Sequence, residues 1–308
     1  MRIVCAGEAM IELAINRADP TRATIGTAGD TLNTAIYLKR ALDEAHVEAD
    51  VAYATCVGTD AFSDRLLALL DKEGIDTSLV GRLPDRLPGL YAISTDERGE
   101  RSFSYWRENS AARRLFASDT RPALAELASA DVLYLSAITL AILPEAVRDR
   151  LFDWIADWRR PPGHRFAFDS NYRPRLWPSR EAAVQATRTA WQLCDIALPS
   201  LDDEQALFGD ADEAAVMRRL RTDGVGAGAL KRGEAGPRCF QGSEAGQAFA
   251  AAERVVDSTA AGDSFNGAYL AALVAGEATG AALQAGHRCA ARVVGHAGAI
   301  VPRHSSGS

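Results

Sequence analysis

At 308 residues the chain is long enough for one large α/β domain with a small accessory element. It is 47% hydrophobic and 24% charged, as is usual for a globular protein, and its net charge of −7 gives no basic footprint for a nucleic acid. The five cysteines are scattered and form no CxxC pair, which argues against a disulfide framework or a zinc site and indicates a reducing, cytoplasmic environment.

The sequence predicts neither a signal peptide nor a membrane span. The N-terminal stretch "MRIVCAGEAMIEL" is apolar but is interrupted by Glu8 and Glu12, so it lacks the continuous apolar centre of a signal peptide. No apolar run along the chain approaches the roughly 18 residues that a membrane span needs. We therefore expect no membrane partner.

The first quarter of the chain alternates predicted strands and helices. Residues 2–7 are typical of a buried strand, and 31–44 have the apolar spacing of a helix. A second strand is predicted over 50–58, followed by a helix over 60–74 that ends at a glycine. This order is typical of a sheet with parallel strands.

Residues 88–106 interrupt the alternation of strands and helices. Two runs of alternating apolar and polar residues flank "DERG", which is the pattern of a β-hairpin rather than of a βα unit. We expect this hairpin to form a lid at one end of the sheet, contributed mainly by about 85–110.

The alternation returns from residue 131 and continues towards the end of the chain. Strands are predicted within 131–138, 165–173 and 226–233, and helices within 144–160, 179–194 and 202–209. Strands that alternate with helices imply a mostly parallel sheet covered on both faces. The chain is thus expected to be a single α/β domain over 1–302, with a disordered tail at 303–308.

The stretch "VVDSTAAGDSFNGAYLAAL" runs from a strand-like pair, Val255 and Val256, through small residues into a helix beginning near Asp263. A helix N-terminus presents free N–H groups, and the small residues at 260–262 let a phosphate approach them. Asp263 would then be an acid beside an anion site. Alternatively, Asp263 is only the N-cap of the helix, a position where Asp is favoured. Residue chemistry alone leaves both readings open.

"DSTAAGDSFNGAYLA" closely resembles the C-terminal signature of the ribokinase-like (PfkB) sugar kinases, which is usually DTxGAGD. Ser258 and Ala260 are mild departures that keep the small-residue turn and the acid. The resemblance extends from Gly7 to Pro302. It implies a three-layer α/β sandwich with a central, mostly parallel sheet and a small β lid.

The same resemblance implies roles for the residues of this signature. Asp263 is expected to be the catalytic base and also to touch the sugar, while the backbone of Ala260, Ala261 and Gly262 forms an anion hole. Thr259, Ala260 and Gly262 are expected to contact ATP.

The N-terminal half carries a second matching motif. "TAGDTLNTAIYLKR", residues 27–40, looks like the first signature of the family, where a glycine-rich turn and an asparagine line the sugar site. By this resemblance Gly29, Asp30 and Asn33 bind the substrate. The alternative is that Asp30 and Asn33 are a helix cap and a first-turn polar residue.

Finer features resemble the branch of the family that phosphorylates 2-keto-3-deoxygluconate, a sugar acid. They are "LPGLYAI", "YWRENSAA", "DSNYRPRLW" and "LPSLDDEQALFG". A sugar-acid site must hold a carboxylate, and arginine can bond both of its oxygens. The resemblance implies that Arg107, Arg173, Tyr91 and Tyr105 bind the substrate. The alternatives are surface salt bridges for the arginines and packing within the lid for the tyrosines.

The nucleotide contacts are expected in the last third of the chain. The family usually has Asn-x-x-Glu after the strand that precedes "LPSLDDEQALFG", and Ser200 and Asp203 stand in those places here. Ser200 can donate to a phosphate, and Asp203 is a shorter carboxylate for a water-bridged Mg²⁺. By resemblance Lys231 and Gly233 lie near the phosphates. "GVGAG" at 224–228 lacks the strand-before, helix-after context of a dinucleotide fingerprint, so we expect an αβ connection there.

The resemblance therefore predicts an ATP- and Mg²⁺-dependent kinase for the 6-hydroxyl of 2-keto-3-deoxygluconate. A kinase for a neutral sugar such as fructose is the alternative within the family, and a sugar-acid sensor without turnover is a third reading. Because lids in this family can mediate dimerisation, the resemblance also implies a homodimer through the lid. No nucleic-acid partner is expected.

Overall fold

A computed structural model describes residues 1–95, 101–241 and 248–303. Its centre is a six-stranded sheet in the order β10-β9-β8-β1-β4-β5, and every neighbouring pair in it is parallel. The strands are β1 (Arg2–Ala6), β4 (Asp50–Val57), β5 (Val80–Arg82), β8 (Val132–Ser136), β9 (Arg165–Asp169) and β10 (Ile196–Ala197). The mostly parallel sheet that the sequence predicts is confirmed.

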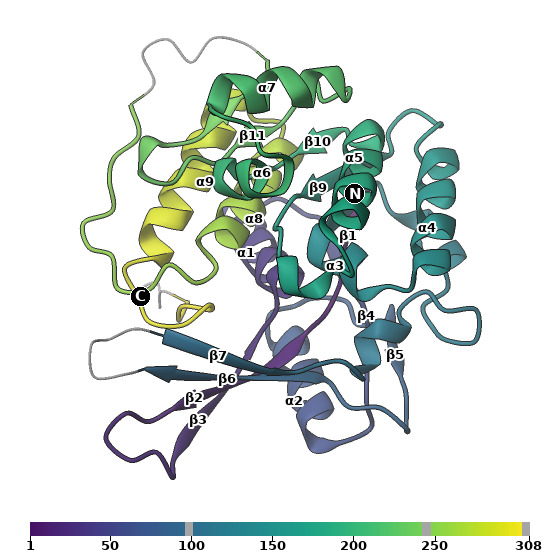
Figure 1. The fold of residues 1–308 in the computed structure, drawn as a ribbon, viewed down its shortest axis with the longest axis vertical. Coiled ribbons are helices and arrows are strands. Elements are labelled where there is room, and N and C mark those ends of the chain that lie inside the picture. The colour runs from purple at the N-terminus through teal and green to yellow at the C-terminus, as the bar shows by residue number, and fades with distance from the viewer. Residues whose placement is uncertain (96–100, 242–247, 304–308) are drawn as a thin grey trace.

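Helices cover both faces of this sheet, as Figure 1 shows. One layer contains α1 (Asp30–Glu44), α2 (Ala61–Lys72), α8 (Ala261–Val274) and α9 (Thr279–Val293). The other contains α3 (Ala137–Ile142), α4 (Glu145–Trp158), α5 (Arg180–Leu193), α6 (Leu201–Phe208) and α7 (Glu213–Thr222). The result is a three-layer sandwich with the sheet in the middle.

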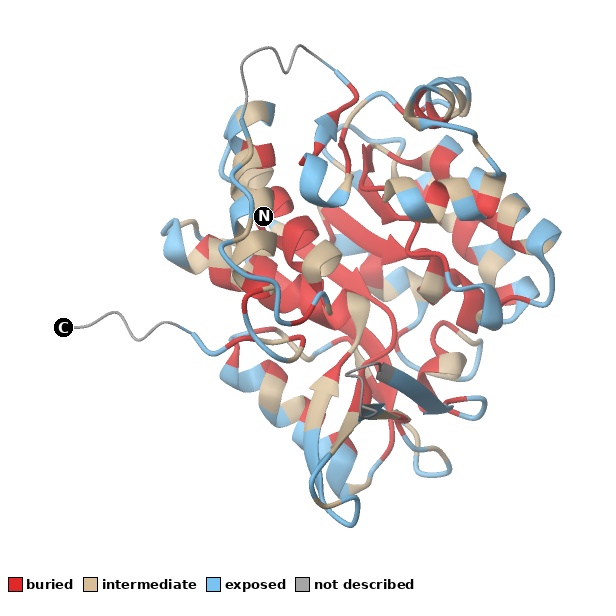
Figure 2. Cartoon of the chain, turned by 60° about the vertical axis from the view of Figure 1, so that its left-hand side comes forward, coloured by how far each residue is buried: buried red, intermediate tan, exposed pale blue. Residues whose placement is uncertain are grey.

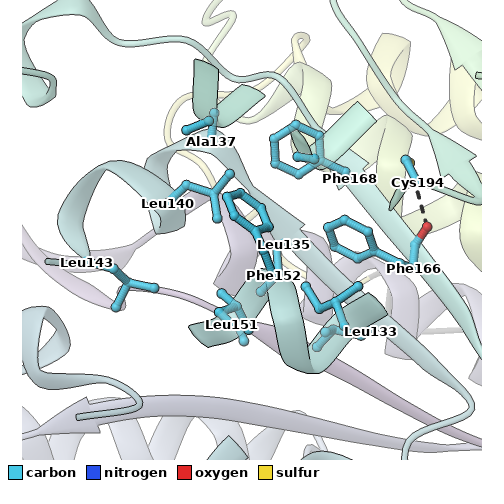
Figure 3. Packing of buried hydrophobic residues seen from close by; sticks show 14 of the residues in the cluster. Leu133, Leu135, Ala137, Leu140, Leu143, Leu151, Phe152, Phe166, Phe168 and Cys194 are labelled. Carbon is cyan, nitrogen blue, oxygen red and sulfur yellow. Dashed lines mark hydrogen bonds between the residues drawn. The ribbon is translucent and has the colours of Figure 1, made fainter. Parts of the chain in front are cut away.

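The two layers follow from strict alternation along the strands. In β8, Leu133 and Leu135 belong to the core beneath α3, α4 and α5, whereas Val132 and Tyr134 belong to the core beneath α1 and α8. Successive side chains of a strand point to opposite faces, so a strand buried on both faces is apolar throughout. Figure 2 shows the buried centre, and Figure 3 shows Leu133 and Leu135 packed beside Leu140 and Phe152.

A second sheet forms the lid, in the order β3-β2-β6-β7. Its strands are β2 (Met10–Ile15), β3 (Ala23–Ala28), β6 (Gly89–Thr95) and β7 (Arg101–Trp106). The predicted hairpin is confirmed as the antiparallel pair β6–β7, although its turn at 96–100 lies outside the described residues. The sequence did not predict β2 and β3, which supply the other half of the lid and join it through the parallel pair β2–β6.

The remaining elements agree with the sequence in most respects. A short antiparallel pair, β11 (Ala229–Leu230) and β12 (Arg238–Cys239), lies beside β10 through the bridge between Ala197 and Gly228. The glycines at 224–228 connect α7 to β11, as expected. In the predicted tail Arg303 pairs with Glu73, and 304–308 lie outside the described residues.

Helices α1 and α8 cross very closely because α8 has a glycine at the crossing. A Cβ on Gly267 would lie 2.6 Å from the nitrogen of Leu38 and 2.7 Å from the oxygen of Thr34. Since α1 carries Asn33 and α8 carries Asp263, this glycine sets the spacing of two predicted site residues.

We expect Gly267→Ala to lower the free energy of unfolding by about 1–3 kcal/mol, because the added methyl group overpacks the crossing. It should also lower kcat/KM by moving Asp263 away from Asn33. Urea unfolding and an assay of ADP release measure the two effects. Unchanged stability together with unchanged activity would contradict the role of this crossing.

Candidate active site

One cavity of about 930 Å³ lies between the lid and the carboxyl edge of the central sheet. Ligands of open α/β sheets bind at this edge, where the loops that follow the strands converge. Every site residue predicted from the sequence lines this cavity, although those residues are spread over more than two hundred positions. The lining also includes residues that the sequence did not single out, chiefly Glu8, Asp169, Asn171 and Arg232.

Asp263 lies in the first turn of α8, but it does not cap the helix. The N-cap is Ala260, in the left-handed conformation at φ 61°, and Asp263 is the third helical residue. Its Oδ2 accepts a hydrogen bond from Nδ2 of Asn33 on α1 at 2.8 Å. The reading of Asp263 as an N-cap is therefore wrong, and its carboxylate is turned towards another helix.

The turn before α8 is stabilised by hydrogen bonds to a buried aspartate. Asp257 is 5% exposed, and its Oδ1 accepts hydrogen bonds from the backbone N–H and the hydroxyl of Thr259. Its Oδ2 accepts from the backbone N–H of Gly298. The following residues at 260–262 line the cavity with almost no side chain, so their backbone is open to an anion. Val255 and Val256 form no strand and are 65% and 48% exposed.

Two carboxylates at the floor of the cavity influence each other. Burial and the nearby charge of Asp30 raise the pKa of Asp263 to about 8. Burial also raises the pKa of Asp30, whose Oδ2 accepts a hydrogen bond from Nδ2 of Asn171 at 2.9 Å. Asp30 is the first residue of α1 and Gly29 is the N-cap, so the reading of Asp30 as a helix cap is wrong.

A buried network connects this floor to Lys231. Its Nζ donates to Oδ2 of Asp169 at 2.7 Å and to Oδ1 of Asn266 at 3.1 Å. Nδ2 of Asn266 donates in turn to Asp169 and, at 3.0 Å, to the hydroxyl of Tyr134. Asp169 is 2% exposed and Asn266 is fully buried. Lys231 is therefore held in place at the cavity wall with its charge partly balanced.

The two predicted carboxylate-binding arginines have different environments. Arg107 is 8% exposed and forms an ion pair with Glu8, which is 1% exposed. Its reading as a surface salt bridge is wrong, because the pair is buried. Arg173 has a side chain that is 54% exposed, and its longest-range partner is Asp203 at 3.4 Å. Exposed pairs of this kind contribute little, so Arg173 is the arginine whose charge is available.

The predicted tyrosines lie opposite each other on β6 and β7, as their positions on the two arms of the hairpin imply. Their ring centroids are 5.8 Å apart, and Phe103 packs 6.3 Å from Tyr91. The hydroxyl of Tyr91 donates to Oε2 of Glu12 on β2. Both tyrosines also line the cavity, so their packing within the lid is confirmed and their contact with a substrate stays a prediction.

Ser200 and Asp203 lie at the start of α6, and both line the cavity. Ser200 is the N-cap, and its Oγ accepts a hydrogen bond from the N–H of Asp203 at 3.3 Å. Burial raises the pKa of Asp203, and the guanidinium of Arg173 opposes this shift. Gly233 follows Lys231 in a left-handed turn at φ 57° and also lines the cavity.

Within 1–95, 101–241 and 248–303, no group of three or more His, Cys, Asp or Glu side chains is arranged to hold a metal ion. Across the same ranges, no helix has the length and apolar character to cross a membrane.

A family model described as pfkB family carbohydrate kinase matches residues 1–305. The chain belongs to this family. The acid and the small-residue turn of its C-terminal signature line the same cavity as the lid residues Tyr91 and Tyr105.

Several known proteins resemble this pfkB-family chain along its whole length. A 2-dehydro-3-deoxygluconokinase of Escherichia coli K12 is 42% identical, over 99% of this chain and 98% of that protein. A solved structure titled 2-dehydro-3-deoxygluconokinase, from Thermotoga maritima, has a TM-score of 0.80 at 19% identity and covers 98% of this chain and 94% of its own. A putative ribokinase II of E. coli, solved with ATP and Mg²⁺, has a TM-score of 0.79 at 22% identity, covering 97% and 94%.

Proposed function

We propose that this protein is a 2-dehydro-3-deoxygluconokinase, which transfers the γ-phosphoryl group of ATP to the 6-hydroxyl of 2-dehydro-3-deoxygluconate (2-keto-3-deoxygluconate). The observation that carries this proposal is that one cavity holds both the half-buried acid of the kinase signature and an exposed arginine suited to a carboxylate. The 42% identity to a relative of that name supports the choice of substrate.

In this proposal Asp263 is the general base. A primary alcohol is a poor nucleophile, so a positioned carboxylate that takes its proton speeds the attack on phosphorus. Burial in the cavity raises the pKa of Asp263, which makes the carboxylate a better proton acceptor than an exposed aspartate. Asn33 orients the carboxylate through the 2.8 Å hydrogen bond to its Oδ2.

The turn at 259–262 and the residues around Lys231 are proposed to receive the nucleotide phosphates. Phosphoryl transfer depends mainly on positioning and on stabilising the charge of the transferring group. A cradle with no bulky side chains fits such an anion, and Lys231, Gly233 and Ser200 line the adjoining wall. Mg²⁺ bound with the nucleotide would neutralise phosphate charge, and Asp203 is the carboxylate proposed to hold one of its waters.

The sugar acid is proposed to bind between the lid and the floor. Arg173 and Arg107 face its carboxylate, and Tyr91 and Tyr105 lie over its carbon chain. Gly29, Asp30 and Asn33 complete the set, with Asp30 accepting from a hydroxyl of the sugar. Closure of the lid would exclude water from the transfer.

This assignment predicts a specific pH dependence. Because Asp263 must be deprotonated to act as a base, kcat/KM should fall as the pH decreases below about 8. The charge of Asp30 raises the pKa of Asp263, so Asp30→Asn should move this acidic limb to lower pH even as it weakens sugar binding. The measurement is the pH profile of the residual kcat/KM of Asp30→Asn. If the acidic fall in kcat/KM stayed at the same pH as in the wild type, or moved to higher pH, the influence of Asp30 on the pKa of Asp263 would be contradicted.

The proposed function is tested by ADP release with a panel of keto-deoxy sugar acids and neutral hexoses. The proposal expects the highest kcat/KM with 2-dehydro-3-deoxygluconate. Higher kcat/KM with fructose would favour the neutral-sugar kinase instead, and binding without ADP release from any substrate would favour the sensor. The cytoplasmic location, the single domain over 1–302 and the homodimer through the lid remain predictions, and light scattering tests the last of them.

A further inference from the structure

Glu8 and Arg107 occupy two of the four places where the chain passes between the lid and the rest of the fold. Glu8 lies between β1 and β2, and Arg107 follows β7. Nη2 of Arg107 donates to Oε2 of Glu8, and both residues line the cavity. The ion pair therefore joins the point where the chain first enters the lid to the point where it last leaves it.

Each partner also has a buried polar atom with no hydrogen bond among the described residues. These atoms are Oε1 of Glu8 and Nε of Arg107. An ionised carboxylate can accept several hydrogen bonds, and a buried polar group without a partner needs an explanation such as a ligand. A Cβ on Gly89 would lie 2.5 Å from Oε1 of Glu8, so the glycine leaves room for this oxygen.

The chemistry of the two free atoms defines their ligand. Oε1 of Glu8 needs a donor such as a hydroxyl, and Nε of Arg107 needs an acceptor such as a carboxylate or keto oxygen. A hydroxyl close to an acid group provides both. In the open-chain form of the sugar acid of the proposed function, the hydroxyl closest to the carboxylate is that of C4, since C2 is a ketone, C3 carries no hydroxyl and C6 receives the phosphoryl group.

We propose that Glu8 is a specificity-determining residue that accepts a hydrogen bond from the 4-hydroxyl of the sugar acid through Oε1. Its other oxygen holds Arg107 beside the acid group. Because the pair lies at two of the connections between the lid and the rest of the fold, a movement of the lid that admits the substrate would give the hydroxyl access to Oε1. The configuration at C4 is the difference between the gluconate- and galactonate-derived keto acids, so Glu8 distinguishes these two epimers. This inference rests on the proposed function.

The test compares kcat/KM for the two epimers and for the 4-deoxy analogue in the wild type and in Glu8→Gln. A hydrogen bond to a charged acceptor should give the wild type roughly 10-fold or greater preference for one epimer. Glu8→Gln removes the charge and keeps the shape, so its preference should fall to a few-fold. The matched control is Glu73→Gln, since Glu73 forms a buried pair with Arg40 outside the cavity, and it should keep the wild-type ratio.

The inference is overturned if Glu8→Gln keeps the wild-type ratio, or if the wild type itself uses both epimers and the 4-deoxy analogue within about 2-fold. If Glu8→Gln does not fold, the double variant Glu8→Gln/Arg107→Gln removes both charges together. The double variant binds the carboxylate of both epimers more weakly, so this loss cancels in the ratio of the two kcat/KM values. A ratio equal to that of the wild type would therefore overturn the inference for this variant as well. A wild type that releases no ADP with either keto acid defeats the proposed function itself, and this inference with it.

Discussion

Replacing Asp263 by asparagine is expected to lower kcat by roughly 10²–10⁴-fold, the usual contribution of a general base. The amide keeps the shape of the side chain and can still accept the hydrogen bond that Asn33 donates at 2.8 Å. The variant should therefore fold and bind the sugar with a KM close to that of the wild type. A loss of kcat without a loss of binding identifies a group that acts on the reacting hydroxyl. Steady-state ADP release measures both constants.

The matched control for Asp263→Asn is the same substitution at an aspartate that only caps a helix. Asp212 is the N-cap of α7 and accepts a hydrogen bond from the N–H of Ala215 at 2.7 Å, outside the cavity. Asparagine caps a helix about as well as aspartate, so Asp212→Asn should leave kcat and stability unchanged. Near-normal turnover in Asp263→Asn would remove the base from the proposed mechanism.

Arg173→Ala is expected to raise KM for the sugar acid roughly 10–100-fold, the cost of losing a hydrogen bond to a charged group. The side chain of Arg173 is 54% exposed and only weakly paired with Asp203, so its guanidinium is available to a carboxylate. A neutral hexose offers no carboxylate, and its KM should change far less. The measurement is KM for both substrates in the same variant.

A neighbouring arginine provides the control for Arg173. Arg175 is exposed on the same loop but does not line the cavity, so Arg175→Ala should leave both KM values unchanged. If Arg173→Ala raised the two KM values equally, the residue would not be recognising the acid group of the substrate.

Periodicity predicted the central sheet because its strands are buried on both faces and are followed by helices. The same reasoning missed β2 and β3. Only Met10 and Ile11 of β2 are buried, and β2 pairs with β6, which lies far along the sequence. A short, half-buried strand whose partner is distant leaves a weak local pattern, and Glu12 within it looked like an interruption of an apolar run.

In the candidate site, too, the sequence predicted residues that lie in local motifs and missed residues whose role depends on a distant partner. The signature motifs located Asp263, Asn33 and Lys231, whose side chains all line one cavity. Asp169 was not found, because its role depends on meeting Asn266, 97 positions later, on another element. Glu8 was read only as a charge, since its pairing with Arg107 spans 99 positions. Motifs identify the groups proposed to do the chemistry, while the buried partners of these groups become apparent only in the folded chain.

The burial of Asp263 also has a consequence for folding. In the unfolded chain its carboxyl group returns to the ordinary pKa of 3.8, whereas in the native cavity the pKa is about 8. A native pKa above the unfolded value means that this group favours the native state less as the pH rises from about 4 to 8. At neutral pH the native cavity holds Asp263 mostly in its protonated form, whereas the unfolded chain gains free energy by ionising it. Asp263→Asn removes this penalty, so the variant should melt at a higher temperature than the wild type while being far less active. The residue best placed for the reaction is one that lowers the stability of the protein without its ligands.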